Sequence, residues 1–293
     1  MESASGPSVR RALGAKRIKV AQRQSAWACR RKLIAWSVVA GVFTLLVLLA
    51  PLFAPHDPIA GELALMNQAP SGEYLLGTDY LGRCIACRAI WGARTSLLAA
   101  LAITLICFVV GSVLGALSGS IGGAFDAVVM RITDAFMAFP AIVLSIAIAG
   151  MLGGGMANAV IALAVPGWTR FARLARGEVL SMKGRTFVLA ERAAGASGFT
   201  IAVRHVLPNI MPALLVTAAV TVGNMILSLA GLSFLGLGAA PPAPELGSMV
   251  NLGAKDFALA PWAVFGPGAV ILVMVMVFNL FGDAANDYLD SLR

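Results

Sequence analysis

The sequence has few charged residues. Only 12% of its 293 residues are Asp, Glu, Lys or Arg, whereas 59% are hydrophobic. About a quarter of the residues of a soluble globular domain are charged, and disordered chains are polar and poor in apolar residues. The composition therefore excludes both classes, and we expect many of the apolar side chains to face lipid.

Residues that bind nucleotides or perform catalysis are also scarce. A P-loop ends in Gly-Lys-Ser/Thr, and none of the five lysines is followed by a hydroxyl residue. The two histidines, His56 and His205, fall on opposite sides of the membrane in the topology derived below. A histidine-based metal centre or catalytic triad within one chain is therefore not expected, and we predict a chain that is not an enzyme and binds no cofactor of its own.

The four cysteines give no complete metal site. Cys84 and Cys87 form a C-x2-C pair, but no second pair follows to complete a four-ligand zinc site. We expect two unpaired small residues one helical turn apart, with a strained disulfide or a metal-binding pair as the alternatives. The sequence therefore predicts no metal site.

Long apolar runs dominate the rest of the chain. A helix needs about 20 apolar residues to cross a bilayer core of about 30 Å. The sequence contains enough runs for six transmembrane helices, and it predicts an all-α integral membrane protein. The predicted spans are Leu33–Ala54, Leu97–Leu117, Ala127–Leu152, Ala157–Ala175, Ile210–Leu232 and Pro261–Gly282.

The distribution of basic residues predicts the orientation. Residues 1–32 contain nine bases and one acid, and the remaining residues carry 13 of each. With the N-terminus inside, 18 bases lie on the inner side and 4 on the outer side. Cytoplasmic segments are enriched in Lys and Arg, so both termini are predicted to be cytoplasmic. A basic tail beside a first span orients the protein and binds anionic lipid, and no nucleic acid partner is expected.

These observations divide the chain into four parts. The segment Arg170–Arg204, on the inner side, carries seven bases. The predicted parts are a basic cytoplasmic tail (1–32), a first transmembrane helix (33–54), an external loop (55–96), and a five-helix core (97–293) containing a cytoplasmic loop at about 176–208.

The centre of this cytoplasmic loop contains a predicted short helix. The residues from Thr186 to Ala194 mostly favour helix, and Gly195 is a suitable stop. Leu207-Pro208 then begins the next span, because proline is tolerated in the first turn of a helix. Such a helix is well placed to dock a soluble partner. The alternative is an amphipathic helix lying on the lipid surface.

Several motifs of the chain resemble one protein family. The short Ala-rich helix, the glycine and the following His-x-Leu-Pro are similar to the cytoplasmic coupling loop of permease subunits of binding-protein-dependent ABC importers. Further segments resemble the peptide and nickel class, and specifically its second permease subunit. These are Leu76–Arg83, Gly92–Leu97, Ala138–Pro140, Leu232–Gly238 and Phe278–Asp283.

The resemblance implies a type I ABC importer permease fold and a set of partners. These are a second permease subunit forming a heterodimer, two cytoplasmic ATPases that carry ATP and magnesium, and an external solute-binding protein. The implied cargo is a short peptide such as a dipeptide or oligopeptide, with nickel or a nickel chelate as the alternative within the family. A stand-alone channel or ion-coupled transporter is the alternative of another class.

The same resemblance implies the residues that couple to the ATPase. The family usually has Glu-Ala-Ala where this chain has Leu189-Ala190-Glu191, so the glutamate lies two places later. Cys84, Cys87 and Leu246 also depart from the usual Asp, Ser and Trp of the family. The predicted ATPase-coupling residues are Leu189, Ala190, Glu191, Gly195, His205, Leu207 and Pro208.

Few polar residues interrupt the spans. Asn224 and Ser228 are four residues apart on one face of the fifth span, and Asn279 lies in the sixth. They are candidates for the substrate path, although polar residues in spans also bond to neighbouring helices. Arg131 and Asp134, three residues apart, are expected to form an ion pair on one helical face.

Overall fold

Helices make up most of the part that the structure describes. The computed structural model describes residues 7–291. The elements are α1 (Pro7–Leu49), η1 (Ala50–Phe53), η2 (Leu63–Leu65), α2 (Ile85–Ile121), α3 (Gly123–Met137), α4 (Ala141–Leu152), α5 (Met156–Lys183), α6 (Thr186–Ala193), α7 (Gly198–Ile201), η3 (Ala202–Val206), α8 (Leu207–Phe234), α9 (Leu246–Lys255) and α10 (Trp262–Asp290).

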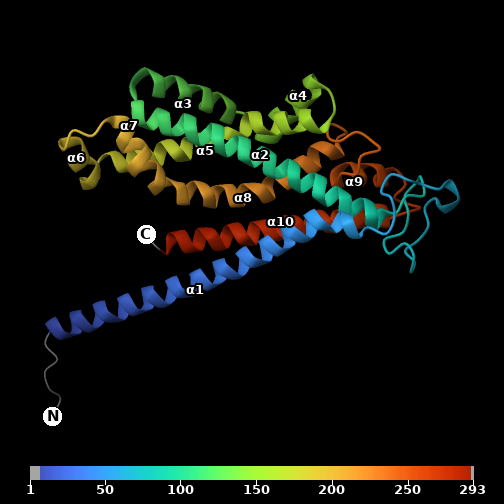
Figure 1. The fold of residues 1–293 in the computed structure, drawn as a ribbon, viewed down its shortest axis with the longest axis horizontal. Coiled ribbons are helices and arrows are strands. Elements are labelled where there is room, and N and C mark those ends of the chain that lie inside the picture. The colour runs from blue at the N-terminus through green and yellow to red at the C-terminus, as the bar shows by residue number, and fades with distance from the viewer. Residues whose placement is uncertain (1–6, 292–293) are drawn as a thin grey trace, which may run out of the picture.

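The long helices run side by side and leave shorter elements at the two ends of the bundle. α2 packs against α5 and α8, and α10 packs against α8 and α1 (Figure 1). α6 and α7 lie at one end, which we call the α6 end. The segment between α1 and α2 lies with α9 at the opposite end, which we call the α9 end (Figure 1). The predicted cytoplasmic loop and the predicted external loop are thus far apart.

Within residues 7–291, four helices are long and apolar enough to cross a membrane. They cover Trp27–Leu52, Ile85–Ile121, Arg204–Phe234 and Trp262–Asp290. The second of these begins well before the predicted start at Leu97 and takes up part of the predicted external loop. The prediction of an all-α membrane protein with several spans is confirmed.

The predicted third and fourth spans differ from simple straight spans. The third is broken into α3 and α4, which are bent by 89° and count as a fifth span only when taken together. Pro140 precedes α4 with extended backbone angles, and a proline disfavours helical geometry in the residue before it. The predicted fourth span lies within α5, whose second half carries Arg170, Arg173 and Arg176. The structure therefore does not confirm the predicted number of six transmembrane helices.

α1 is a single helix that continues across the predicted boundary between tail and span. From Ile34 to Leu49 it exposes large apolar side chains on several sides, as expected of a helix that faces lipid. Lys32 binds the Asp287 carboxylate of α10 at 2.7 Å. The helix ends where Pro51 enters the 3-10 turn.

A glycine stripe brings α2 and α5 into close contact. Gly111, Gly115 and Gly119 recur every four residues on the buried face of α2. A Cβ atom added at Gly115 would overlap the backbone of Ala172 in α5, and one at Gly111 would overlap the carbonyl oxygen of Trp168. Small residues at this spacing let helix backbones approach closely in membranes. The stripe therefore sets the distance between these two helices.

A buried glutamate begins α9. Glu245 is fully buried, and its carboxylate accepts hydrogen bonds from the backbone N–H groups of Gly247 (3.0 Å) and Ser248 (2.8 Å). The hydroxyl of Ser96 in α2 donates a third bond to the same carboxylate at 2.9 Å. Glu245 thus caps α9 and joins it to α2.

Replacement of this glutamate tests its role in stability. Glu245→Ala would leave buried N–H groups without a partner, and each such group costs about 1–3 kcal/mol. We expect the free energy of unfolding to fall by about 3 kcal/mol. Thermal melting in detergent measures this change, with Glu73→Ala as the control because Glu73 is exposed. Equal melting of the two variants would show that the cap contributes little.

Candidate functional site

The predicted coupling region forms a compact group of short helices at the α6 end. α5 ends at Lys183, and α6 covers Thr186–Ala193, close to the predicted helix. The chain then reverses at Gly195, whose φ of +85° favours glycine. The Ser197 hydroxyl oxygen accepts the N–H of Thr200 at 3.2 Å and starts α7. Residues that are close in the sequence therefore determine the turn after α6.

One face of this group is anchored in the bundle. Val188 of α6 is 1% exposed, and Ile201 and Val206 are also buried. They belong to the same core as Val179 and Met182 of α5. Burial of these side chains holds α6 and the start of α8 to the end of α5.

A polar contact joins α6 to the beginning of α8. The Oε1 atom of Glu191 lies 3.4 Å from Nε2 of His205. The ring of His205 also lies near that of Phe187, with centroids 6.4 Å apart. The backbone carbonyl of His205 accepts the Asn209 side-chain amide at 2.7 Å. The structure therefore brings together two of the predicted coupling residues, Glu191 and His205.

The remaining predicted coupling residues lie on the surface. Leu189 of α6 is 52% exposed, and Ala190 and Gly195 are exposed beside it. Leu207 and Pro208, in the first turn of α8, are also exposed. Leu189 and Ala190 give α6 an apolar outer face opposite its anchored residue Val188.

Ion pairs hold the α6 end of α3 and α5 together. Arg176 of α5 binds both carboxylate oxygens of Asp126 at 2.6 Å. Arg173 binds the carboxylate of Asp134 at 2.7 Å. The predicted pair within α3, Arg131 with Asp134, is wrong, because the neighbouring helix supplies the partner. These ion pairs join α3 to α5.

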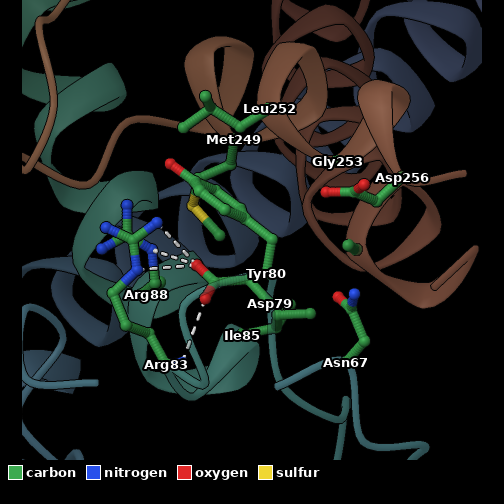
Figure 2. A pocket seen from close by; sticks show the side chains of 11 residues that line it. Asn67, Asp79, Tyr80, Arg83, Ile85, Arg88, Met249, Leu252, Gly253 and Asp256 are labelled. Atoms are coloured by element: carbon green, nitrogen blue, oxygen red, sulfur yellow. Dashed lines mark hydrogen bonds and ion pairs between the residues drawn. The ribbon is translucent and has the colours of Figure 1, made fainter. Parts of the chain in front are cut away.

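A second polar cluster lies at the α9 end and explains the Leu76–Arg83 motif. Figure 2 shows the Asp79 carboxylate directed toward the guanidinium groups of Arg83 and Arg88. Arg83 binds it at 2.7 Å, and Arg88 lies at 3.7 Å. Arg88 is 2% exposed and donates a hydrogen bond to the carbonyl of Pro58 at 2.7 Å. The motif thus fastens the segment after α1 onto the first turn of α2.

The polar residues predicted for the substrate path lie on two helices. Asn224 is exposed and Ser228 is partly buried on α8. Asn279 of α10 faces Gly223 of α8, since a Cβ atom added at that glycine would overlap the amide oxygen of Asn279. Asn279 therefore lies between the two helices, whereas Asn224 is open to the surface of the chain.

Several structurally important residues were missed from the sequence. The glycine stripe of α2 carries a detectable signal, its four-residue spacing. Glu245 carries a weaker one, an acid just before a helix. The approach of His56 to Cys84 and Cys87, whose possible ligand atoms all lie within 4.8 Å of one another, carries no local signal, because these residues are distant in the sequence.

Comparison with known proteins gives consistent matches. Residues 111–292 match the family described as "Binding-protein-dependent transport system inner membrane component". The chain is 40% identical over 266 residues to the nickel transport system permease protein NikC of Escherichia coli K12, covering 91% of this chain and 95% of that protein. It is 40% identical over 259 residues to the glutathione transport system permease protein GsiD of Pectobacterium atrosepticum, covering 87% and 86%.

A third relative and a solved structure extend these matches. The probable D,D-dipeptide transport system permease protein DdpC of E. coli K12 is 39% identical over 255 residues, covering 87% of this chain and 85% of that protein. A chain from inward-facing MetNI methionine ABC transporter structures aligns with a TM-score of 0.54 at 21% identity, covering 69% of this chain and 95% of that chain. The match to the MetNI chain shows a shared fold.

Proposed function

Because this chain belongs to the family of binding-protein-dependent transport system inner membrane components, we propose that it is one permease subunit of an ATP-driven importer that carries short peptides across the inner membrane. It is a multi-pass membrane protein and a permease of the nickel, peptide and glutathione class. The single observation that carries the proposal is the near full-length match to permeases of this class. The choice of a short peptide as the cargo goes beyond this match.

The proposed orientation places the α6 end in the cytoplasm. The excess of bases on this side supports it, since cytoplasmic segments are enriched in Lys and Arg. The N-terminal and C-terminal ends then lie on the cytoplasmic side, and the α9 end faces the external solute-binding protein. A second permease subunit pairs with this chain to complete the path.

In the proposed mechanism, α6 transmits the movement of an ATPase. ATP and magnesium bind to the two partner ATPases, whose closure displaces α6. The exposed face with Leu189 and Ala190 contacts the ATPase, together with Glu191 and Gly195. His205, Leu207 and Pro208 fix the angle between this region and α8. The contact between Glu191 and His205 supports a rigid connection. Closure thus changes the orientation of α5 and α8, which switches access across the membrane.

The proposed cargo is a short peptide. Two of the relatives are permeases for glutathione and, probably, D,D-dipeptides, whereas NikC belongs to a nickel system. The substrate-path candidates Asn224, Ser228 and Asn279 offer amide and hydroxyl groups. Such groups suit the backbone of a peptide, whereas a transition metal favours histidine and carboxylate or thiolate ligands.

The cargo is tested with the complete importer in proteoliposomes. Uptake of a labelled dipeptide is measured beside uptake of radioactive nickel, each with the partner binding protein and ATP. We expect the dipeptide to be taken up and nickel to give the background rate. Nickel uptake without peptide uptake would reject the peptide proposal and favour the metal alternative.

The turn at Gly195 gives a prediction on coupling. A side chain at a φ of +85° is strained by about 1 kcal/mol, although the surrounding space is open. We expect Gly195→Ala to move α6 and to lower ATP-driven uptake more than ATP hydrolysis. The control is Gly198→Ala, which also enters open space but has no positive φ. Full uptake at normal hydrolysis in Gly195→Ala would remove the turn from the mechanism.

A further inference from the structure

Two cysteines and a histidine meet at the α9 end, outside the regions assigned above. His56 follows α1, whereas Cys84 and Cys87 lie at the start of α2. The Nδ1 atom of His56 lies 3.7 Å from Sγ of Cys87. One nitrogen and the two sulfur atoms all lie within 4.8 Å of one another. The fold has therefore brought three metal-ligating groups from two distant segments to one place.

These distances suit a shared metal ion. Zinc binds sulfur at about 2.3 Å and imidazole nitrogen at about 2.0–2.1 Å, so a sulfur and a nitrogen on one tetrahedral zinc ion are about 3.6 Å apart. The 3.7 Å between His56 and Cys87 is close to this value. The cysteines are free rather than joined by a disulfide, so both sulfur atoms are available as ligands.

The surroundings hold the three groups in position. Cys84 is the N-cap of α2, and its sulfur accepts the N–H of Cys87 at 3.3 Å. This bond holds the Cys84 side chain at the first turn of α2, next to Cys87. The ring of His56 stacks on Tyr74 with centroids 5.1 Å apart. The ligands are therefore oriented before a metal arrives.

A buried arginine adds to this preorganisation. Arg88 lies one residue after Cys87 and donates a hydrogen bond to the Pro58 carbonyl, two residues after His56. The segment that carries His56 is thus tied to α2 independently of the metal. Cys84 and Cys87 are 4% and 0% exposed, and His56 is partly exposed. The sulfur atoms are shielded, and the histidine side leaves an entry path.

We propose that His56, Cys84 and Cys87 bind one thiophilic metal ion, which fastens the segment after α1 to the N-terminus of α2. Two thiolates and an imidazole select soft or borderline ions such as Zn²⁺ or Cu⁺. On binding, the ion displaces the two thiol protons, and with Zn²⁺ a water fills the fourth position. The site is independent of the transported cargo, because it lies in the connection between α1 and α2.

The test uses the full-length chain purified in detergent under reducing conditions. The chain is incubated with Zn²⁺ or Cu⁺, freed of unbound metal, and its metal content is measured. Co²⁺ is added in parallel, because a cobalt–thiolate bond gives a charge-transfer band near the ultraviolet. We expect one ion per chain, the cobalt band, and a higher melting temperature with Zn²⁺.

Matched variants identify the ligands. Cys84→Ser, Cys87→Ser and His56→Gln should each weaken binding by at least about 100-fold, since even outer-shell partners contribute 10–100-fold. Cys29→Ser is the control, because Cys29 lies in α1 away from the cluster, and it should bind as wild type does. Should one serine variant fail to fold, the other variants and the wild-type stoichiometry still decide.

Three results would overturn the proposal. The first is wild-type protein that binds neither Zn²⁺ nor Cu⁺. The second is binding that survives in both serine variants. The third is a disulfide between Cys84 and Cys87 that excludes metal. Mass spectrometry would detect it in protein purified without reductant, and it would persist after reductant is added.

Discussion

The substitution Ala190→Arg is expected to abolish ATP-driven uptake while leaving the permease folded. Ala190 is exposed on α6, so the substitution disturbs little of the core. In the proposed complex, however, a small side chain lets the ATPase approach α6 closely, and arginine would separate the two surfaces. Loss of a central interface contact costs about 2 kcal/mol or more, which corresponds to an about 30-fold weaker ATPase affinity.

This prediction is measured by co-purification of the ATPases and by uptake in proteoliposomes. The matched control is Ala64→Arg, the same change at an exposed alanine of η2 at the α9 end, which should retain the ATPases. Melting temperatures of both variants check that the fold is intact. Normal ATPase binding by Ala190→Arg would show that α6 docks differently or is not the docking element.

The substitution Gly115→Leu is expected to separate α2 from α5 and to destabilise the whole bundle. A single Cβ atom at Gly115 already overlaps the backbone of Ala172, and backbone has no alternative rotamer. Overpacking a close interface costs about 1–3 kcal/mol and occasionally more, so we expect a loss of about 3 kcal/mol. The yield of folded protein in detergent should fall accordingly.

Thermal melting and size-exclusion chromatography measure this loss. Gly150→Leu is the control, because Gly150 lies in α4 with nothing within 4 Å of an added Cβ atom. A side chain there enters open space and should leave the melting temperature unchanged. Equal stability of the two leucine variants would contradict the close packing of α2 on α5.

Local signals predicted several features of the segment between α5 and α8. Thr186 begins α6 as expected, and Gly195 has the positive φ that a helix stop requires. Pro208 lies in the first turn of α8. Each of these features depends on residues that are close in the sequence, so composition and spacing were sufficient to predict them.

Features that depend on distant residues were not predictable in the same way. Asp134 has an arginine three residues away, but the neighbouring helix presents Arg173 at 2.7 Å. The apolar run Ala127–Leu152 gives no measure of the 89° bend that separates α3 from α4. His56 meets the two cysteines because the segment after α1 folds back onto α2. Packing between segments decides all three.

The central claim is that this chain transports only when separate ATPases act through α6. The most direct measurement is cargo uptake into proteoliposomes that contain this chain and its partner permease, with and without the ATPases, ATP and the binding protein. The account predicts uptake only when all components are present, and its loss in Ala190→Arg. Uptake by this chain alone, without ATPases or ATP, would contradict the account and identify a channel or ion-coupled transporter.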